Sequence, residues 1–219
     1  MSDMGNPDGV RQSKTRAIAP ERPVVAFDFD GTLTIRDSFT AFLRWRAGAG
    51  DWVLGLAKMA PDLAAYVVDR DRGRLKAASV RQFLKGTPRA QLEADAEAFA
   101  GQVWPGFLRH DALACWKAWG ETGAHRVIVT ASPETTVAPF ARRLGAEALI
   151  GTALAFDGDS RVTGAFATPN CRGEEKVRRL RAVYGENIRL AAAYGDTSGD
   201  AEMLQIADDA GFRRFTSRS

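Results

Sequence analysis

The chain has 219 residues, of which 45% are hydrophobic and 26% are charged, and its formal net charge is +3. A chain of this size forms one globular domain with a modest insertion, or two small domains. The near-balanced charge gives no reason to expect a nucleic acid as partner.

The first 22 residues are polar and contain no apolar core. This composition predicts a disordered tail over residues 1–22 rather than a signal peptide. The two cysteines, Cys115 and Cys171, match no metal-ligand spacing. A disulfide framework is not expected, and we predict a protein of the reducing cytoplasm.

Three short apolar segments, residues 23–29, 125–131 and 189–195, are typical of buried parallel strands. Each carries a polar or acidic residue at or near its carboxyl end. Helical patterns over residues 133–145 and 174–185 both end at a glycine. Strands and helices alternate in this order, which predicts an α/β fold with a Rossmann-like, doubly wound parallel sheet.

Two segments interrupt this alternation. Residues 152–167 form two alternating runs around Asp-Gly-Asp-Ser, which predicts a small β-hairpin that projects from the sheet. From residue 36 to about 120 the sequence has helical patterns and no comparable strand. We predict a core of residues 23–36 and 103–219, with an all-helical cap over residues 37–102 inserted after the first strand.

The insertion is basic and partly apolar. Residues 36–89 contain 11 Lys and Arg but 5 Asp and Glu, which favours anionic substrates, an anionic surface or simply solvated helix faces. Residues 52–68 are mostly apolar, but Lys58, Pro61 and Asp62 count against a membrane span. Two interpretations are open: buried cap helices, or peripheral contact with the inner membrane surface.

Two carboxylates follow the first strand, in the segment Asp28-Phe29-Asp30-Gly31-Thr32. In an extended segment, residues two apart face the same side. Both carboxylates would therefore lie at the carboxyl edge of the sheet, where open α/β sheets bind ligands. Two like charges at one point need a cation or a shared proton. An Asx-turn that ends the strand is the alternative interpretation.

Two further polar signals lie at the start of helices. Thr130 and Ala131 end the second strand, where a hydroxyl and free N–H groups could bind an anion. Ser132 could instead simply cap the helix that follows. Lys176 lies in the first turn of its helix, against the helix dipole, and is either a phosphate ligand or a surface lysine.

A second pair of acids, Asp196 and Asp200, follows the third apolar strand in the segment GDTSGD. Alone, this pair is a weak metal signal. Together, the four signals give several carboxylates, one lysine and one hydroxyl at the same edge of a parallel sheet. This set suits Mg²⁺ and a phosphate, because Mg²⁺ prefers oxygen ligands and binds through few carboxylates and substrate oxygens.

In this order, DFDGT, Thr130, Lys176 and GDTSGD resemble the four motifs of the haloacid dehalogenase-like (HAD) hydrolase superfamily. The resemblance covers residues 23 to about 207. The helical insertion after the first motif, with VTASPE, GEEKVRRL and AYGDTSGDAEML, is similar to subfamily IB, the phosphoserine-phosphatase-like branch. The run SFTAFLR and the pattern C-R-G-x-E-K are similar to its phosphatidylglycerophosphatase C type.

The resemblance implies a Mg²⁺-dependent phosphomonoester hydrolase and a role for each motif residue. Asp28 would be the nucleophile that forms an aspartyl-phosphate, and Asp30 the general acid and then the base. Asp28, the main-chain carbonyl of Asp30, and Asp196 would hold Mg²⁺. Asp200 would orient Lys176 or a metal-bound water. The phosphoryl oxygens would be bound by Thr130, Ala131 and Lys176, with Gly31 and Thr32 as supporting residues.

Asp37 and Arg74 are the candidates for substrate specificity. The resemblance aligns Asp37 with an acid that contacts the substrate amine in phosphoserine phosphatases, but Asp37 could equally cap the next helix. Arg74 and Lys76 could meet a substrate anion. The substrate would be a phosphorylated small molecule or a lipid phosphate, with phosphoserine-like compounds and phosphatidylglycerophosphate as candidates.

Three other functions are weighed against this one. A dehalogenase of the same fold needs no second acid and no Mg²⁺, so Asp30 and the pair at 196 and 200 count against it. Phosphotransfer to an acceptor other than water is compatible with the motifs. A non-catalytic binding or regulatory protein on this scaffold would be expected to lack a nucleophile or a metal acid, and none is missing.

Overall fold

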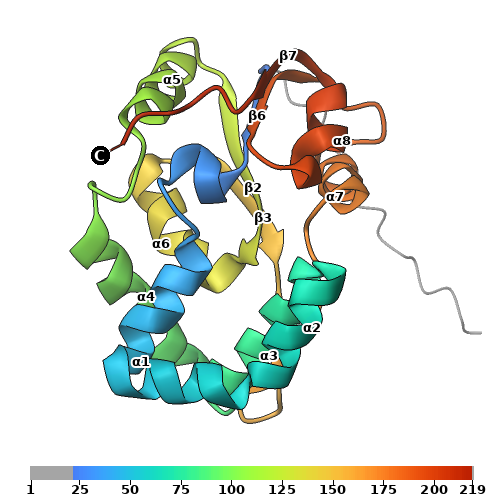
Figure 1. Ribbon diagram of the computed structural model, residues 1–219. Helices are drawn as coiled ribbons and strands as arrows, with labels where there is room; N and C mark the ends of the chain where they lie inside the picture. The colour runs from blue at the N-terminus through green and yellow to red at the C-terminus, as the bar shows by residue number, and fades with distance from the viewer. Residues whose placement is uncertain (1–21, 219) are drawn as a thin grey trace, which may run out of the picture.

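A parallel sheet of five strands forms the centre of the computed structural model, which describes residues 22–218 (Figure 1). The predicted α/β fold is confirmed, whereas the predicted tail lies, except for Arg22, outside the described residues. The middle strand β1 pairs with β2 on one side and with β6 on the other. In sheet order the strands are β3 (Ala148–Thr152), β2 (His125–Pro133), β1 (Val24–Phe27), β6 (Leu190–Gly195) and β7 (Ala207–Phe212).

Helices cover both faces of the sheet, so the side chains of β1 alternate between two buried clusters. Val25 and Phe27 face a cluster that includes residues of α5 (His110–Glu121) and α6 (Glu134–Leu144). Val24 and Ala26 face a cluster formed with α7 (Glu174–Tyr184) and α8 (Ala201–Gln205). Burial on both faces explains why this strand is a continuous apolar run in the sequence.

The predicted helical insertion consists of four helices between β1 and α5, below the sheet in Figure 1. They are α1 (Ser38–Lys58), α2 (Ala60–Asp69), α3 (Arg72–Phe83) and α4 (Arg89–Val103). The two linkers lie side by side, since Ile35 N donates to the carbonyl of Phe107 and Arg109 N donates to that of Leu33. We place the return to the core at these linkers, a few residues after the predicted boundary.

The insertion shares its hydrophobic core with the sheet. Phe42 of α1 and Phe99 of α4 belong to the same buried cluster as Phe27 of β1. The Phe99 ring lies 6.1 Å from that of Phe140 in α6, in a T-shaped arrangement. Glu97 of α4 also pairs with Arg142 of α6 at 2.6 Å, although an exposed ion pair adds little stability. Apolar packing therefore holds the cap over the edge of the sheet.

The predicted hairpin is confirmed as the antiparallel pair β4 (Leu154–Phe156) and β5 (Val162–Phe166). The hairpin lies outside the parallel sheet, and its main chain forms hydrogen bonds with the cap. Gly86 N donates to the carbonyl of Val162, Val162 N donates to that of Thr87, and Arg89 N donates to that of Ser160. The hairpin is thus a second connection between the core and the cap.

The apolar stretch over residues 52–68 is divided between two helices, because α1 ends at Lys58 and α2 begins at Ala60. Among residues 22–218, no helix is both long and apolar enough to cross a membrane. Met59 is buried, with 3% of its surface exposed, whereas Val53 and Val68 are 65% and 86% exposed. The stretch therefore supplies both cap interior and outward-facing apolar side chains.

Candidate active site

The carboxyl ends of β1, β2 and β6 meet at a cleft of about 230 Å³ beneath the cap. Asp28 follows β1, Ala131 lies near the end of β2, and Asp196 follows β6. All three line the cleft, together with Lys176 from the first turn of α7. The parallel topology thus brings motifs that are far apart in the sequence to one edge of the sheet.

Lys176 is the most deeply buried charge of the cleft, with 1% of its surface exposed. Its Nζ donates to Asp28 Oδ1, to Asp200 Oδ1 and to the carbonyl of Val129, each at 2.6 Å. An ammonium has three protons to donate, so all of them are used. These partners offset the cost of burying the charge and account for a lysine at a helix start.

Burial and neighbouring charges separate the acidities of these groups. Burial raises the pKa of Asp28 to about 7, against the opposing effect of Lys176. Burial alone would raise the pKa of Asp200, but Lys176 and hydrogen bonds from Thr197 lower it overall. Burial would lower the pKa of Lys176, but Asp28 and Asp200 raise it well above its usual range. Lys176 and Asp200 therefore form a charged pair at neutral pH.

Asp30 lines the same cleft but has a separate set of partners. Its Oδ1 accepts from Ser38 N at 2.6 Å, and its Oδ2 accepts from Ser132 Oγ at 2.5 Å. Burial, followed by the charge of Asp37, raises the pKa of Asp30, and Lys76 opposes the shift. The two aspartates of the first motif are thus held differently, as their different predicted roles require.

Three carboxylates of the cleft are close enough to share a cation. Asp28, Asp196 and Asp200 each offer an oxygen within 4.8 Å of the others. Asp196 Oδ1 is buried and has no hydrogen-bond partner among the described residues. Burial and the charges of Asp200 and Asp30 raise the pKa of Asp196. An unpartnered oxygen among converging carboxylates fits a hard divalent cation such as Mg²⁺, with Asp200 added to the predicted side chains.

Gly31 gives Asp196 the space to approach. Its φ of +82° favours glycine, and a Cβ at this position would lie 2.3 Å from Asp196 Oδ2. We expect Gly31→Ala to destabilise the protein by more than the roughly 1–2 kcal/mol of backbone strain, because Asp196 must also move. Thermal unfolding without Mg²⁺ measures the loss of stability. The change in unfolding temperature when Mg²⁺ is added measures the displacement of Asp196.

Gly86→Ala is the matched control for this prediction. Gly86 has a φ of +81°, but its Cβ would meet nothing within 4 Å. This variant should therefore show the backbone strain alone and keep the response of the unfolding temperature to Mg²⁺. Equal losses in both variants, with equal responses to Mg²⁺, would contradict the close approach of Gly31 and Asp196.

The threonines of the first and second motifs are buried and do not line the cleft. Thr130 is fully buried, and its Oγ1 accepts from Ser132 N at 3.0 Å. Ala131 lines the cleft, whereas Thr130 does not. Thr32 is also buried, and its Oγ1 donates to Asp28 Oδ2 at 3.5 Å. Phosphate binding by Thr130 and Ala131 remains a prediction.

Of the two predicted specificity residues, only Asp37 lines the cleft. It also caps α1, since its Oδ1 accepts from Thr40 N at 2.7 Å. Arg74 instead forms an ion pair with Asp69 in the cap and does not line the cleft. Helix α3 begins at Arg72, so positions 72 and 76 share a face that position 74 does not. Arg72 and Lys76 line the cleft in its place.

Sequence reasoning missed the roles of Ser132 and Arg172. Ser132 does not cap α6, whose N-cap is Pro133; its hydroxyl donates to Asp30. Lys76 Nζ lies 3.4 Å from Ser132 Oγ and donates to the carbonyl of Ala131 at 3.1 Å, which links the cap to this segment. Arg172 lines the cleft, and its position in the C-R-G-x-E-K run was the available signal.

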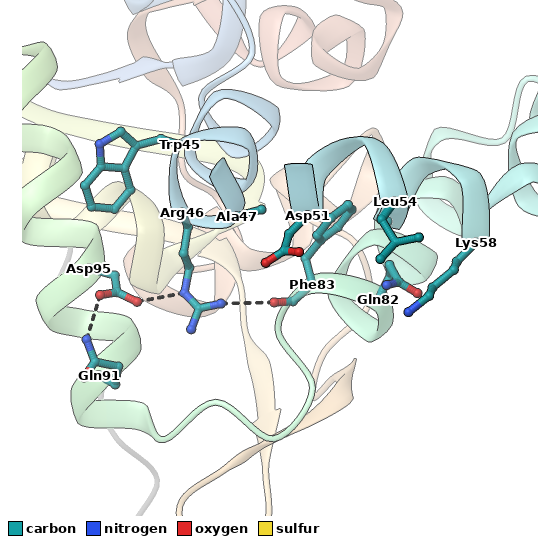
Figure 2. A pocket seen from close by; sticks show the side chains of 11 residues that line it. Trp45, Arg46, Ala47, Asp51, Leu54, Lys58, Gln82, Phe83, Gln91 and Asp95 are labelled. Atoms are coloured by element: carbon teal, nitrogen blue, oxygen red, sulfur yellow. Dashed lines mark hydrogen bonds and ion pairs between the residues drawn. The ribbon is translucent and has the colours of Figure 1, made fainter. Parts of the chain in front are cut away.

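A separate pocket of about 620 Å³ lies in the cap and shares no lining residue with the cleft (Figure 2). Arg46 donates to Asp95 at 2.7 Å and to the carbonyl of Phe83 at 3.1 Å within it. None of the residues of the four motifs contributes to this pocket. The cleft at the sheet edge is therefore the candidate active site.

Comparisons with known proteins identify the family of the chain. The family described as haloacid dehalogenase-like hydrolase matches residues 25–205. Protein CicA of Caulobacter vibrioides is 57% identical over 204 residues, which cover 93% of this chain and 91% of CicA. A phosphoserine phosphatase of Halobacterium salinarum is 32% identical over 195 residues, which cover 85% of this chain and 83% of that protein.

A solved structure of similar fold is that of a protein with unknown function from Bordetella pertussis Tohama I. It has a TM-score of 0.68 and 25% sequence identity, over 84% of this chain and 86% of that chain. The family match covers most of the chain and contains all four motif segments. The protein therefore belongs to the haloacid dehalogenase-like hydrolases, as a phosphatase of the phosphoserine-phosphatase-like subfamily IB.

Proposed function

We propose that this phosphatase hydrolyses phosphomonoesters in a Mg²⁺-dependent reaction with an aspartyl-phosphate on Asp28. The observation that supports it best is the convergence of Asp28, Asp196 and Asp200 around one point, with the buried Asp196 Oδ1 unpartnered. The positively charged Lys176 forms ion pairs with two of these carboxylates, Asp28 and Asp200. This arrangement suits a site that binds a cation and an anionic phosphoryl group together.

In the first step, a carboxylate oxygen of Asp28 attacks phosphorus, and the bond from phosphorus to the ester oxygen breaks. Asp30 gives its proton to the departing oxygen. Its raised pKa favours the protonated acid, and its bonds to Ser38 and Ser132 fix its orientation. Bound Mg²⁺ would offset the negative charge of the phosphoryl group and keep Asp28 ionised.

In the second step, Asp30 accepts a proton from a water molecule, which attacks the phosphorus of the aspartyl-phosphate. The bond between phosphorus and Asp28 breaks, phosphate leaves, and the free carboxylate is restored. Lys176 holds its ammonium against Asp28 and Asp200 before the reaction, so its charge is in position for the phosphoryl oxygens.

A generic aryl phosphate tests the proposal with no knowledge of the natural substrate. We expect turnover with Mg²⁺, loss of turnover when a chelator is added, and recovery when excess Mg²⁺ is restored. Mg²⁺ should also raise the unfolding temperature, because it binds the folded carboxylate cluster. Turnover that is unchanged by the chelator would contradict the Mg²⁺ site. No turnover of any phosphate ester would favour the non-catalytic binding function.

Ser132→Ala should lower kcat by roughly 10- to 100-fold, because Asp30 loses the hydroxyl that orients it. Burial raises the pKa of Asp30, and the hydrogen bond from Ser132 lowers it. Removing this hydrogen bond should therefore raise the pKa of Asp30 further. The limb of the pH profile that reports Asp30 deprotonation should therefore move to higher pH. Ser132→Thr keeps a hydroxyl and should restore most of the activity; an unmoved pH profile in Ser132→Ala would argue against this role.

Two substrate classes are proposed for the cleft. The similarity to a phosphoserine phosphatase and the position of Asp37 support a phosphoserine-like small molecule. The basic residues Arg72 and Lys76 support a lipid phosphate such as phosphatidylglycerophosphate. Kinetic comparison of these esters with phosphocholine and sugar phosphates separates the classes, and an added alcohol as acceptor tests for phosphotransfer.

Peripheral membrane contact from the cytoplasmic side is a further part of the proposal. Val53, Leu54, Val67 and Val68 are exposed on α1 and α2, in the basic part of the chain. Exposed apolar side chains with nearby cations suit an anionic lipid surface. Binding to anionic vesicles that is lost at high salt would support the membrane contact. Failure to bind either anionic or neutral vesicles would oppose it.

A further inference from the structure

Another cavity, of about 400 Å³, adjoins the catalytic cleft and is distinct from the 620 Å³ pocket; we call it the cap cavity. It lies among α1, α2 and α3, and residues of all three helices form its wall. Asp37, Arg72 and Lys76 line both this cavity and the cleft. The two spaces therefore meet at these three residues, which we call the neck.

Beyond the neck the wall of the cavity is mostly apolar, with Thr40, Tyr66 and Ser79 as its polar residues. Among the described residues that form its wall, only the three neck residues are charged. Leu43 and Met59 are buried in the wall, and Trp52 stacks on Phe83 with ring centroids 5.0 Å apart. Such a wall binds apolar ligand groups favourably, because their contact removes apolar surface from water. It offers few hydrogen-bond or ionic partners to a charged group.

Lys76 at the neck contacts the core through its ammonium group. Lys76 Nζ donates to the carbonyl of Ala131 in β2, while its ammonium also lies 5.8 Å from the ring of Phe39 in α1. Lys76 therefore holds a positive charge at the point where the cleft and the cavity meet. A ligand that passes the neck would have its anionic end in the cleft and its apolar end in the cap.

We propose that the cap cavity receives the leaving group of the substrate, and that this group carries a single alkyl or acyl chain. The inference rests on the proposed phosphatase function, because it names the substrate class of that site. The cavity falls in the volume range of small-molecule sites, and it opens to the reacting carboxylates through the neck. A phosphoserine-like substrate has no alkyl chain to place against the apolar wall.

A series of n-alkyl phosphates from ethyl to decyl, each below its micelle concentration, measures the use of the cavity. We expect kcat/KM to rise roughly three- to fourfold for each added methylene until the cavity is filled, and then to level off. Benzyl and naphthylmethyl phosphates, which release alcohols as the alkyl esters do, form a second arm. Higher values for the aromatic esters than for every alkyl ester would overturn the assignment to a chain, as would equal values along the alkyl series.

Ser79 allows the cavity to be filled from its wall. It lies on α3, and its Oγ donates only to the carbonyl of Leu75 in the same helix, at 2.9 Å. Ser79→Phe should reduce the ratio of decyl to ethyl phosphate kcat/KM at least tenfold. The matched variant Ser79→Ala adds no volume beyond Cβ and should keep that ratio. An unchanged ratio in a folded Ser79→Phe protein would overturn the proposal.

Binding of non-hydrolysable alkylphosphonates separates this inference from the proposed function. Calorimetry on the wild-type protein should show much tighter binding of decylphosphonate than of ethylphosphonate. If this holds while no ester is hydrolysed, the cavity assignment stands and the phosphatase mechanism fails. If esters are hydrolysed but neither kcat/KM nor phosphonate binding depends on chain length, the mechanism stands and the cavity assignment fails.

Discussion

Asp28→Asn should reduce the hydrolysis of every phosphomonoester by at least about 10⁴-fold and leave the protein folded. An amide does not attack phosphorus. The substitution also removes one of the three carboxylates that converge in the cleft. The substitution leaves the main-chain bond from Asp28 N to the carbonyl of Tyr194 unchanged, and the Asn side chain still offers an oxygen to Lys176, so we expect the fold to be kept. Turnover with a generic aryl phosphate and thermal unfolding measure the two effects.

The same substitution has a pH-dependent effect on stability in the absence of Mg²⁺. Burial raises the pKa of Asp28 from 3.8 to about 7 in the folded protein. The unfolded chain ionises first, so ionisation opposes folding increasingly as the pH rises between these values. The unfolding temperature of Asp28→Asn relative to the wild type should therefore increase across this window.

Asp51→Asn is the matched control, because Asp51 is exposed in the cap and lies outside the cleft. It makes the same chemical change and should keep wild-type turnover. Near-normal turnover of Asp28→Asn with this control in hand would remove Asp28 as the nucleophile. Loss of both activity and folding in Asp28→Asn would show that the carboxylate is structural.

Lys176→Met should destabilise the protein by about 3–5 kcal/mol and abolish activity. The variant leaves Asp28 and Asp200 buried without the cation that both contact at 2.6 Å. It also leaves the carbonyl of Val129 without this donor. Chemical unfolding measures the loss of stability, and the aryl phosphate assay measures the loss of activity.

Two further variants identify the cause of this loss. Lys117→Met changes an exposed lysine of α5 and should alter stability by less than about 0.5 kcal/mol. Adding Asp200→Asn to Lys176→Met removes one of the uncompensated charges and should restore part of the stability. If Lys176→Met alone costs no more than Lys117→Met, the buried ion pairs do not hold the site together.

The central strands of the sheet could be predicted from the sequence, but its edges could not. The strands β1, β2 and β6 lie inside the sheet, and each contains a short apolar run that ends near polar residues, which is typical of buried parallel strands. The edge strand β7 contains Asp208, Asp209 and Gly211, and it was missed. Edge strands commonly carry charged residues, which removes the apolar pattern. The other edge strand, β3, has an apolar run of only three residues, 148–150, which is too short to indicate a strand.

The charged motif residues line one cleft, and this could be predicted because both the local spacing of the motifs and the parallel topology can be inferred from the sequence. Contacts between the cap and the core are not readable in this way. The approach of Lys76 to Ala131 and Ser132 depends on how α3 packs over β2. The choice between Arg72 and Arg74 depends on the residue at which α3 begins, because a shift of two positions moves a side chain to another face of the helix.

The most direct measurement is mass spectrometry of enzyme that has been quenched in acid during turnover of an aryl phosphate with Mg²⁺. The proposed mechanism predicts one added phosphoryl group on the peptide that contains Asp28, and none when Asp28→Asn is treated in the same way. A phosphoryl group on a different residue, or full turnover with an unmodified Asp28 peptide throughout, would contradict it.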